Sequence, residues 1–132
     1  MKILIVDDSN TMRRVLTMGI LKVFNESEVN ILEAINGQKA LNIIRENKDI
    51  DYVFLDINMP VMKGDEMLKI LRSDDTIKHI KVIMQTTEGI KTKVAQLTKM
   101  GISGYLLKPY TQEIIQQMME KILEKELLAE IE

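Results

Sequence analysis

Three carboxylates directly follow apolar runs in this sequence. Asp7 and Asp8 come after the run Ile3–Val6, and Asp56 comes after Val53–Leu55. Like charges at the mouth of a buried sheet repel one another and lose hydration, so they persist only where a positive charge neutralises them. Carboxylate oxygens are ligands that Mg²⁺ prefers. The pattern therefore predicts a magnesium site that handles a phosphoryl group.

Two further apolar runs end in side chains that suit a phosphoryl group. Val82–Met84 leads through a glutamine to Thr86, and Tyr105–Leu107 leads to Lys108. A carboxylate attacks phosphorus when the developing negative charge is neutralised, and an ammonium group together with Mg²⁺ supplies that neutralisation. Four strand ends are thus expected to bring carboxylates, a hydroxyl and an ammonium to one place.

The elements that position these side chains alternate along the chain. Apolar runs predict strands over residues 2–6, 29–34, 52–55, 80–85 and, after a turn, up to 107. Helical spacing of apolar residues predicts helices from about 11, after 37, over 66–71 and 91–100, and from 111 onward. Because each parallel connection needs a crossover helix, the order predicts an α/β fold with a doubly wound parallel sheet. Such folds bind ligands beyond the carboxyl ends of their strands.

Composition narrows the class of protein. The 132 residues fit one domain over 1–132 and leave no room for a second. The net charge of -2, with dispersed basic residues, argues against nucleic-acid binding. The absence of cysteine excludes disulfides and fits a reducing compartment. No apolar stretch approaches the roughly 20 residues that cross a bilayer, and a strand begins almost at Met1, so we expect a cytoplasmic protein with no membrane span and no signal peptide.

Five ordered segments of the sequence resemble the receiver domain of two-component response regulators, most closely its single-domain chemotaxis members. These segments are Ile5–Asp8, Thr11–Arg14, Asp56–Pro60, Thr86–Glu88 and Gly104–Pro109. The resemblance covers the chain from the first strand to the last helix. It implies a flavodoxin-like fold, with five parallel strands in the order 2-1-3-4-5 and five flanking helices.

The resemblance assigns a role to each acidic residue. Asp56 is expected to accept the phosphoryl group. Asp8 and Asp56, together with the backbone carbonyl of Asn58, are expected to ligate Mg²⁺, and Asp7 is expected to act mostly through a coordinated water. The cofactor implied is therefore Mg²⁺.

Further roles fall on polar residues around the acids. The resemblance implies that Lys108 holds one phosphoryl oxygen, that Thr86 hydrogen-bonds another, and that Thr86 and Tyr105 form the switch. Asn58 and Glu88 flank the reaction centre, and since both are polar and able to orient water, we expect a short-lived phosphoryl state. The Lys108–Pro109 peptide bond is expected to be cis.

The expected function is a phosphorylation-activated signalling switch rather than an enzyme. The implied partners are a chemotaxis-type histidine kinase and a flagellar motor switch protein, a dedicated phosphatase stays open, and a monomer is expected. One alternative is a stand-alone receiver in another phosphorelay. A second is a magnesium-dependent phosphohydrolase with an aspartyl nucleophile, which needs a general acid where this chain has Asn58.

Three further residues carry expectations of their own. Tyr110 stands where phenylalanine is frequent in the family that the chain resembles. Arg13 and Arg14 lie in the first predicted helix, where we expect a solvated surface, with a contact to the kinase as the alternative.

Overall fold

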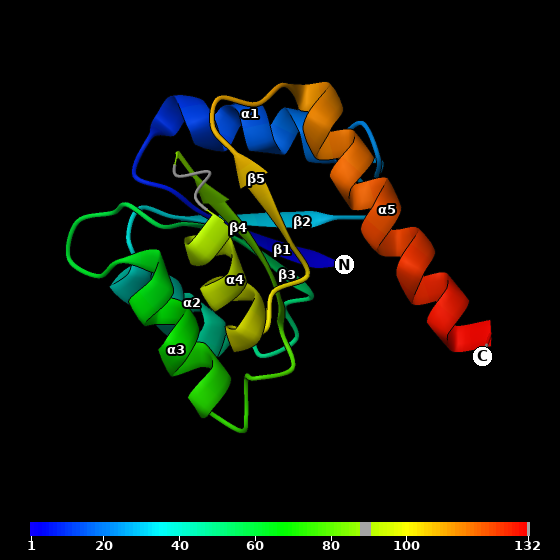
Figure 1. Cartoon of the computed structure of the whole chain (residues 1–132). Helices are drawn as coiled ribbons and strands as arrows, with labels where there is room; N and C mark the ends of the chain where they lie inside the picture. Colours follow the sequence, from blue (N-terminus) through cyan, green and yellow to red (C-terminus); the bar gives the residue numbers. More distant parts are fainter. Residues whose placement is uncertain (88–90, 132) are drawn as a thin grey trace.

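Strands and helices alternate along the chain in the computed structural model (Figure 1). The structure describes residues 1–87 and 91–131. Within these residues the strands are β1 (Lys2–Val6), β2 (Asn30–Ala34), β3 (Tyr52–Asp56), β4 (Lys81–Thr86) and β5 (Gly104–Leu107). The helices are α1 (Asn10–Ile20), α2 (Gly37–Glu46), α3 (Gly64–Ser73), α4 (Lys91–Met100) and α5 (Gln112–Ile131). Every element predicted from the sequence is therefore present.

The strands form one parallel sheet in the order β2-β1-β3-β4-β5. This order confirms the predicted doubly wound, flavodoxin-like fold. Val6 pairs with Leu55, so the residues that follow them, Asp7 and Asp56, leave neighbouring strands side by side. Lys108 follows β5 at the same edge of the sheet. The register of the sheet therefore gathers the candidate side chains.

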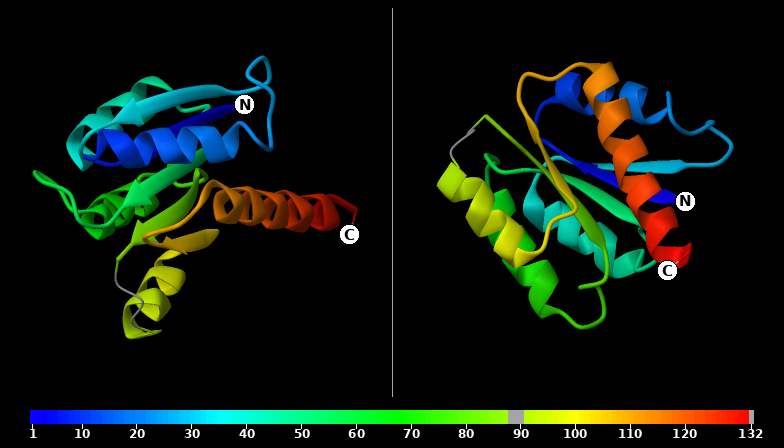
Figure 2. Two further views of the ribbon diagram at one scale, coloured as in Figure 1. Left: turned by 90° about the horizontal axis from the view of Figure 1, so that it is seen from above. Right: turned by 45° about the vertical axis from the view of Figure 1, so that its right-hand side comes forward.

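Helices cover both faces of the sheet, with α1 and α5 on one side and α2, α3 and α4 on the other (Figures 1 and 2). Alternate residues of β1 serve the two sides: Ile3 and Ile5 face α1 and α5, whereas Leu4 and Val6 face α2 and α3. All four are fully buried. Burial of each such side chain stabilises the fold by about 1.5–3 kcal/mol. This two-sided burial explains why the strand is an unbroken apolar run.

Side-chain caps fix where the first two helices begin. Ser9 caps α1, because its hydroxyl accepts a hydrogen bond from the Met12 N–H at 3.2 Å. Asn36 caps α2 in the same way, accepting from the Lys39 N–H at 2.9 Å. Each cap satisfies a helix N–H that has no partner within the helix. The cap of α1 also sets the direction of the chain directly after Asp8.

The apolar pattern of α5 is wider than the face that the helix buries. Ile115, Met119 and Ile122 are buried against the sheet, whereas Ile114 is 44% exposed and Leu127 is 58% exposed. Ile114 and Leu127 therefore continue the apolar spacing of the helix without belonging to the core. The carboxyl-terminal end of α5 projects past the sheet (Figure 2), and Leu127 belongs to this end of the helix. Among the described residues, no helix combines the length and apolar character that a membrane span requires.

Polar contacts anchor α5 to the sheet just before its projecting end. The Tyr52 hydroxyl donates to both carboxylate oxygens of Glu126 at 2.7 Å. The Lys81 ammonium lies 2.5 Å from one of the same oxygens. These contacts join α5 to β3 and β4 at the ends of the strands opposite Asp56.

Candidate functional site

The three predicted acids meet at the carboxyl edge of the sheet. One carboxylate oxygen from each of Asp7, Asp8 and Asp56 lies within 4.8 Å of the other two. Asp7 is fully buried and Asp56 is 4% exposed, whereas Asp8 is exposed. Two buried carboxylates at this separation repel each other strongly, so the cluster requires compensating positive charge.

Lys108 supplies part of that charge. Its ammonium lies 2.9 Å from Asp7 Oδ2 and 3.3 Å from Asp56 Oδ1. The backbone holds the residue in place, because the Lys108 N–H donates to the Thr86 carbonyl at 2.7 Å. The Lys108–Pro109 bond is cis, as expected from the resemblance. The lysine thus bridges the two buried acids.

Burial and charge together set the protonation of the site. Burial, followed by the neighbouring Asp7 charge, raises the pKa of Asp56 to about 6, although Lys108 acts in the opposite direction. For Lys108 itself burial lowers the pKa, but contact with Asp7 and Asp56 outweighs it, and the net shift is upward. At neutral pH the lysine is therefore a cation beside a largely ionised Asp56.

Local contacts fix the backbone and side chain of Asp7. The Ser9 N–H donates to Asp7 Oδ1 at 2.9 Å, and Arg13 Nη1 donates to the Asp7 carbonyl at 2.8 Å. Arg13 Nε also forms an ion pair with Glu33 at 3.1 Å. The expectation of a solvated Arg13 is therefore wrong, because its guanidinium folds back over the end of β1. Helical spacing alone cannot show this contact, since it depends on where β1 ends relative to α1.

Gly64 allows helix α3 to begin against the loop that follows Asp56. Its N–H donates to the Ile57 carbonyl at 2.9 Å. A Cβ atom at this position would lie 2.0 Å from the Asp56 carbonyl oxygen and 2.9 Å from the Ile57 Cα. Only glycine fits this approach without a backbone shift. Sequence reasoning missed this role, because a glycine between a loop and a predicted helix is common.

The remaining predicted residues surround the acids to different degrees. Thr86 is buried at the last position of β4. Asn58 is exposed in the loop after β3, and Tyr105 is 39% exposed on the edge strand β5. Glu88 lies outside the described residues. Thr86 thus lies at the same edge of the sheet as the acid cluster, and Tyr105 lies within the neighbouring strand.

The acidic cluster has the donor chemistry of a Mg²⁺ site. Mg²⁺ prefers oxygen ligands and keeps several waters, so a few carboxylates and a carbonyl are sufficient to bind it. Both oxygens of Asp7 already accept hydrogen bonds, from Lys108 and from Ser9. Asp8 is exposed, and the Lys108 ammonium lies at one of the two carboxylate oxygens of Asp56, so these two residues are the more accessible ligands. The residues present therefore fit Mg²⁺.

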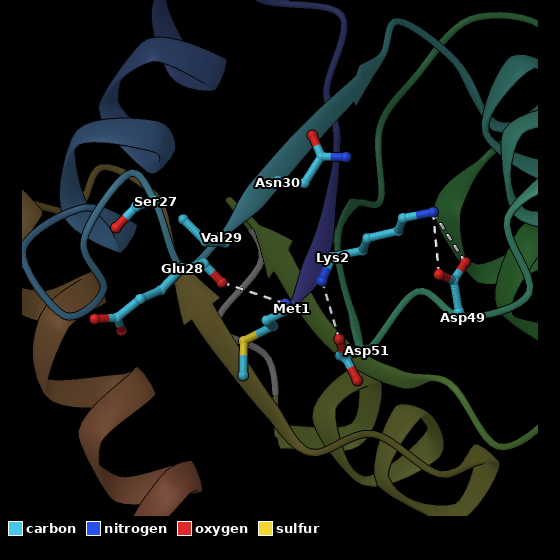
Figure 3. Close-up of a pocket in the computed structure, with 8 residues that line it drawn as sticks. All are labelled: Met1, Lys2, Ser27, Glu28, Val29, Asn30, Asp49 and Asp51. Carbon is cyan, nitrogen blue, oxygen red and sulfur yellow. Dashed lines mark hydrogen bonds and ion pairs between the residues drawn. The ribbon is translucent and has the colours of Figure 1, made fainter.

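A surface pocket lies at the opposite end of the sheet, around the start of β1 and β2 (Figure 3). Internal contacts occupy several of the polar groups that line it. The Met1 ammonium donates to the Glu28 carbonyl at 3.2 Å, and the Lys2 backbone N–H donates to Asp51 at 2.9 Å. The Lys2 ammonium lies 3.0 Å from Asp49. These contacts tie the first residues to neighbouring loops, away from the acids.

The architecture and the acid cluster agree with a comparison to known families. A profile of the response regulator receiver domain matches residues 3–120. The chain belongs to this family. The match includes all five strands and every acid and lysine of the site, so this receiver domain has the phosphoacceptor fold that its sequence predicted. Receiver domains are signalling phosphoacceptors and are not generally classed as enzymes.

Several relatives of this receiver domain are chemotaxis proteins. The chemotaxis protein CheY homolog of Campylobacter jejuni is 35% identical to it, over 93% of this chain and 92% of that protein. CheY1 of Helicobacter pylori is 38% identical, over 93% of this chain and 97% of that protein. The solved structure of CheY4 of Vibrio cholerae has a TM-score of 0.80 and 28% identity, over 92% of this chain and 97% of that chain.

Proposed function

We propose that this receiver domain is a phosphorylation-activated signalling switch, one domain over residues 1–132, that accepts a phosphoryl group from a histidine kinase on Asp56. The observation that carries the proposal is the setting of the Asp56 carboxylate. It is 4% exposed at the end of a central strand, with the Lys108 ammonium 3.3 Å away and two further acids beside it. A nucleophile, a cation and a metal-binding cluster are thus in one place.

In the proposed transfer, an oxygen of the ionised Asp56 carboxylate attacks the phosphorus of a phosphohistidine. An O–P bond forms while the P–N bond breaks, and its electron pair returns to the imidazole nitrogen, which takes a proton from solvent. Lys108 holds a phosphoryl oxygen and so stabilises the developing charge. The Thr86 hydroxyl donates to another phosphoryl oxygen.

Asp8, Asp56 and the Asn58 backbone carbonyl are the proposed Mg²⁺ ligands, with Asp7 acting through a coordinated water. When bound, the ion neutralises negative charge on the carboxylates and the phosphoryl oxygens. Three features of the chain support this assignment: the mutual distance of the carboxylates, the exposure of Asp8, and the contacts that already occupy Asp7.

The proposed switch consists of Thr86 and Tyr105. A change of state needs a contact that differs between the two states, and a Thr86 hydroxyl drawn toward the phosphoryl group supplies one. Space vacated by the hydroxyl then becomes available to the Tyr105 ring. The half-exposed position of Tyr105 on β5 supports this role, because a partner can contact that strand.

A flagellar motor switch protein is the proposed output partner, and a chemotaxis-type histidine kinase is the proposed donor. The similarity to chemotaxis proteins of Campylobacter and Helicobacter supports both partners. We propose that the protein acts as a monomer in the cytoplasm, where the absence of cysteine fits a reducing environment. A phosphohydrolase is disfavoured, because the Asn58 amide does not protonate a leaving group.

A labelling experiment tests the proposed chemistry. Incubation with acetyl phosphate and millimolar Mg²⁺ is expected to add one phosphoryl group, about 80 Da by intact mass spectrometry. Chelation of the metal should suppress the adduct. After removal of the donor the label should decay quickly, because Asn58 and Glu88 are expected to orient water. Absence of the adduct would contradict the function, whereas a label stable for many hours would contradict only the role of these two residues.

A binding experiment separates the motor from another relay. Beryllium fluoride with Mg²⁺ mimics the phosphorylated state, and the treated protein is presented to an immobilised peptide from a flagellar motor switch protein. Retention at least about tenfold above the untreated protein, or about 1.4 kcal/mol in binding free energy, is expected for a motor regulator. Equal retention of both states would favour the stand-alone receiver of another phosphorelay.

A further inference from the structure

Gln85 places a fully buried amide in β4, directly after three buried apolar residues of the strand. Both ends of the amide have partners. Gln85 Nε2 donates to the Val6 carbonyl at 3.4 Å, and the Tyr110 hydroxyl donates to Gln85 Oε1. Tyr110 is itself only 7% exposed. Burying a polar side chain is costly unless it has a hydrogen-bond partner. Here the two buried side chains are partners of each other.

The Gln85 side chain connects three segments that carry the site. Strand β3 lies between β4 and β1, so the hydrogen bond to Val6 crosses the strand that ends in Asp56. Gln85 is paired with Asp56 in the sheet. On its own strand it directly precedes Thr86. The amide thus links the end of β1, the end of β4 and the segment after β5.

Tyr110 belongs to the segment that carries Lys108, two residues before it. Burial raises the pKa of Tyr110, and the charges of Asp7 and Asp56 add to the shift. The phenol therefore keeps its proton at neutral pH and remains a hydrogen-bond donor to Gln85. Its hydroxyl holds the lysine segment against β4.

We propose that Gln85 and Tyr110 form a positioning pair, which fixes the Lys108 segment relative to the Thr86 end of β4 during phosphoryl transfer. The inference rests on the proposed function. Loss of Tyr110 leaves Gln85 Oε1 buried without its donor, and loss of Gln85 leaves the Tyr110 hydroxyl buried without its acceptor, so the remaining side chain must rearrange next to the site. Replacement of both by apolar side chains removes that conflict.

Kinetics of labelling by acetyl phosphate test the pair. Tyr110→Phe and Gln85→Leu are each expected to slow the formation of the adduct roughly tenfold, equivalent to about 1.4 kcal/mol in the barrier. The double variant is expected to recover to within about twofold of the wild type, because the Tyr110 hydroxyl and its Gln85 acceptor are then removed together. The affinity for Mg²⁺, followed by calorimetry, should stay unchanged, since neither residue is a proposed ligand.

Tyr52→Phe is the matched control. Tyr52 is a second buried tyrosine whose hydroxyl donates to a side chain, Glu126, but at the opposite end of the sheet. This variant should lose stability in urea and keep the wild-type labelling rate. If folded Tyr110→Phe and Gln85→Leu also label at the wild-type rate, or if the double variant is as slow as the singles, the positioning pair is overturned. An unlabelled wild type would instead overturn the proposed function.

Discussion

Asp56→Asn is expected to abolish phosphoryl uptake and to raise the free energy of unfolding of the metal-free protein by up to about 3 kcal/mol at pH 7.5. The first effect follows because an amide oxygen does not replace the carboxylate as nucleophile. The second follows because the wild type holds a buried negative charge next to Asp7, and the asparagine of similar volume does not. Chemistry and stability therefore change in opposite directions.

The pH dependence of this gain has a definite sign. The pKa of Asp56 is raised from 3.8 to about 6 by folding, so the folded protein binds the proton more tightly than the unfolded chain. The stability of the wild type therefore falls as pH rises from about 4 to about 6, and the full penalty is present above that range. The advantage of Asp56→Asn should be largest at pH 7.5 and disappear near pH 4.

Urea unfolding in the presence of a chelator measures this advantage. Asp75→Asn is a suitable control, because Asp75 has an 89% exposed side chain and lies outside the acid cluster. We expect the control to differ from the wild type by less than about 0.5 kcal/mol and to become labelled normally. A less stable Asp56→Asn at pH 7.5 would show that the carboxylate is not under electrostatic strain. Persistent labelling of that variant would exclude Asp56 as the acceptor.

Gly64→Ala is expected to destabilise the protein by at least about 3 kcal/mol, toward the upper end of single substitutions. The added Cβ would lie 2.0 Å from the Asp56 carbonyl oxygen and 2.8 Å from its carbonyl carbon. These are backbone atoms that cannot rotate away, so either α3 or the end of β3 must move. The phosphoacceptor lies on that strand, and labelling should slow as well.

Gly37→Ala provides the comparison, because Gly37 also begins a helix and receives the same methyl group. Its nearest neighbours are atoms of Met62 at 3.1 Å, two of them in a flexible side chain. We expect this control to cost at most about 1 kcal/mol in urea unfolding, with labelling close to the wild type. Equal losses for the two alanine variants would mean that the approach of α3 to Asp56 is not restrictive.

The sheet and the acid cluster were predictable from the sequence for a simple physical reason. A central parallel strand is buried on both faces, so residues such as Ile3–Val6 form an unbroken apolar run. Polar residues at the ends of such runs must emerge at one edge of the sheet. This geometry brings Asp7, Asp56 and Lys108 together without any knowledge of the loops.

The supporting contacts were not predictable, because they depend on the path of each segment in three dimensions. Arg13 has the spacing of a surface residue, yet its side chain returns to the Asp7 carbonyl. The Tyr110 hydroxyl donates to Gln85, and this contact depends on the path of the segment after β5. A glutamine within an apolar strand was a signal in the sequence, but it did not identify the partner. Leu127 is exposed because α5 is longer than the surface it covers.

The projecting end of α5 offers a route to spectroscopy. Ala129 is exposed there, and the chain contains no cysteine, so Ala129→Cys would introduce a single thiol for a fluorophore. The dye would lie after Glu126 in α5, at the end of the molecule opposite Asp56. Its anisotropy would then report on the local mobility of this end of α5 during phosphorylation, while the site itself carries no label.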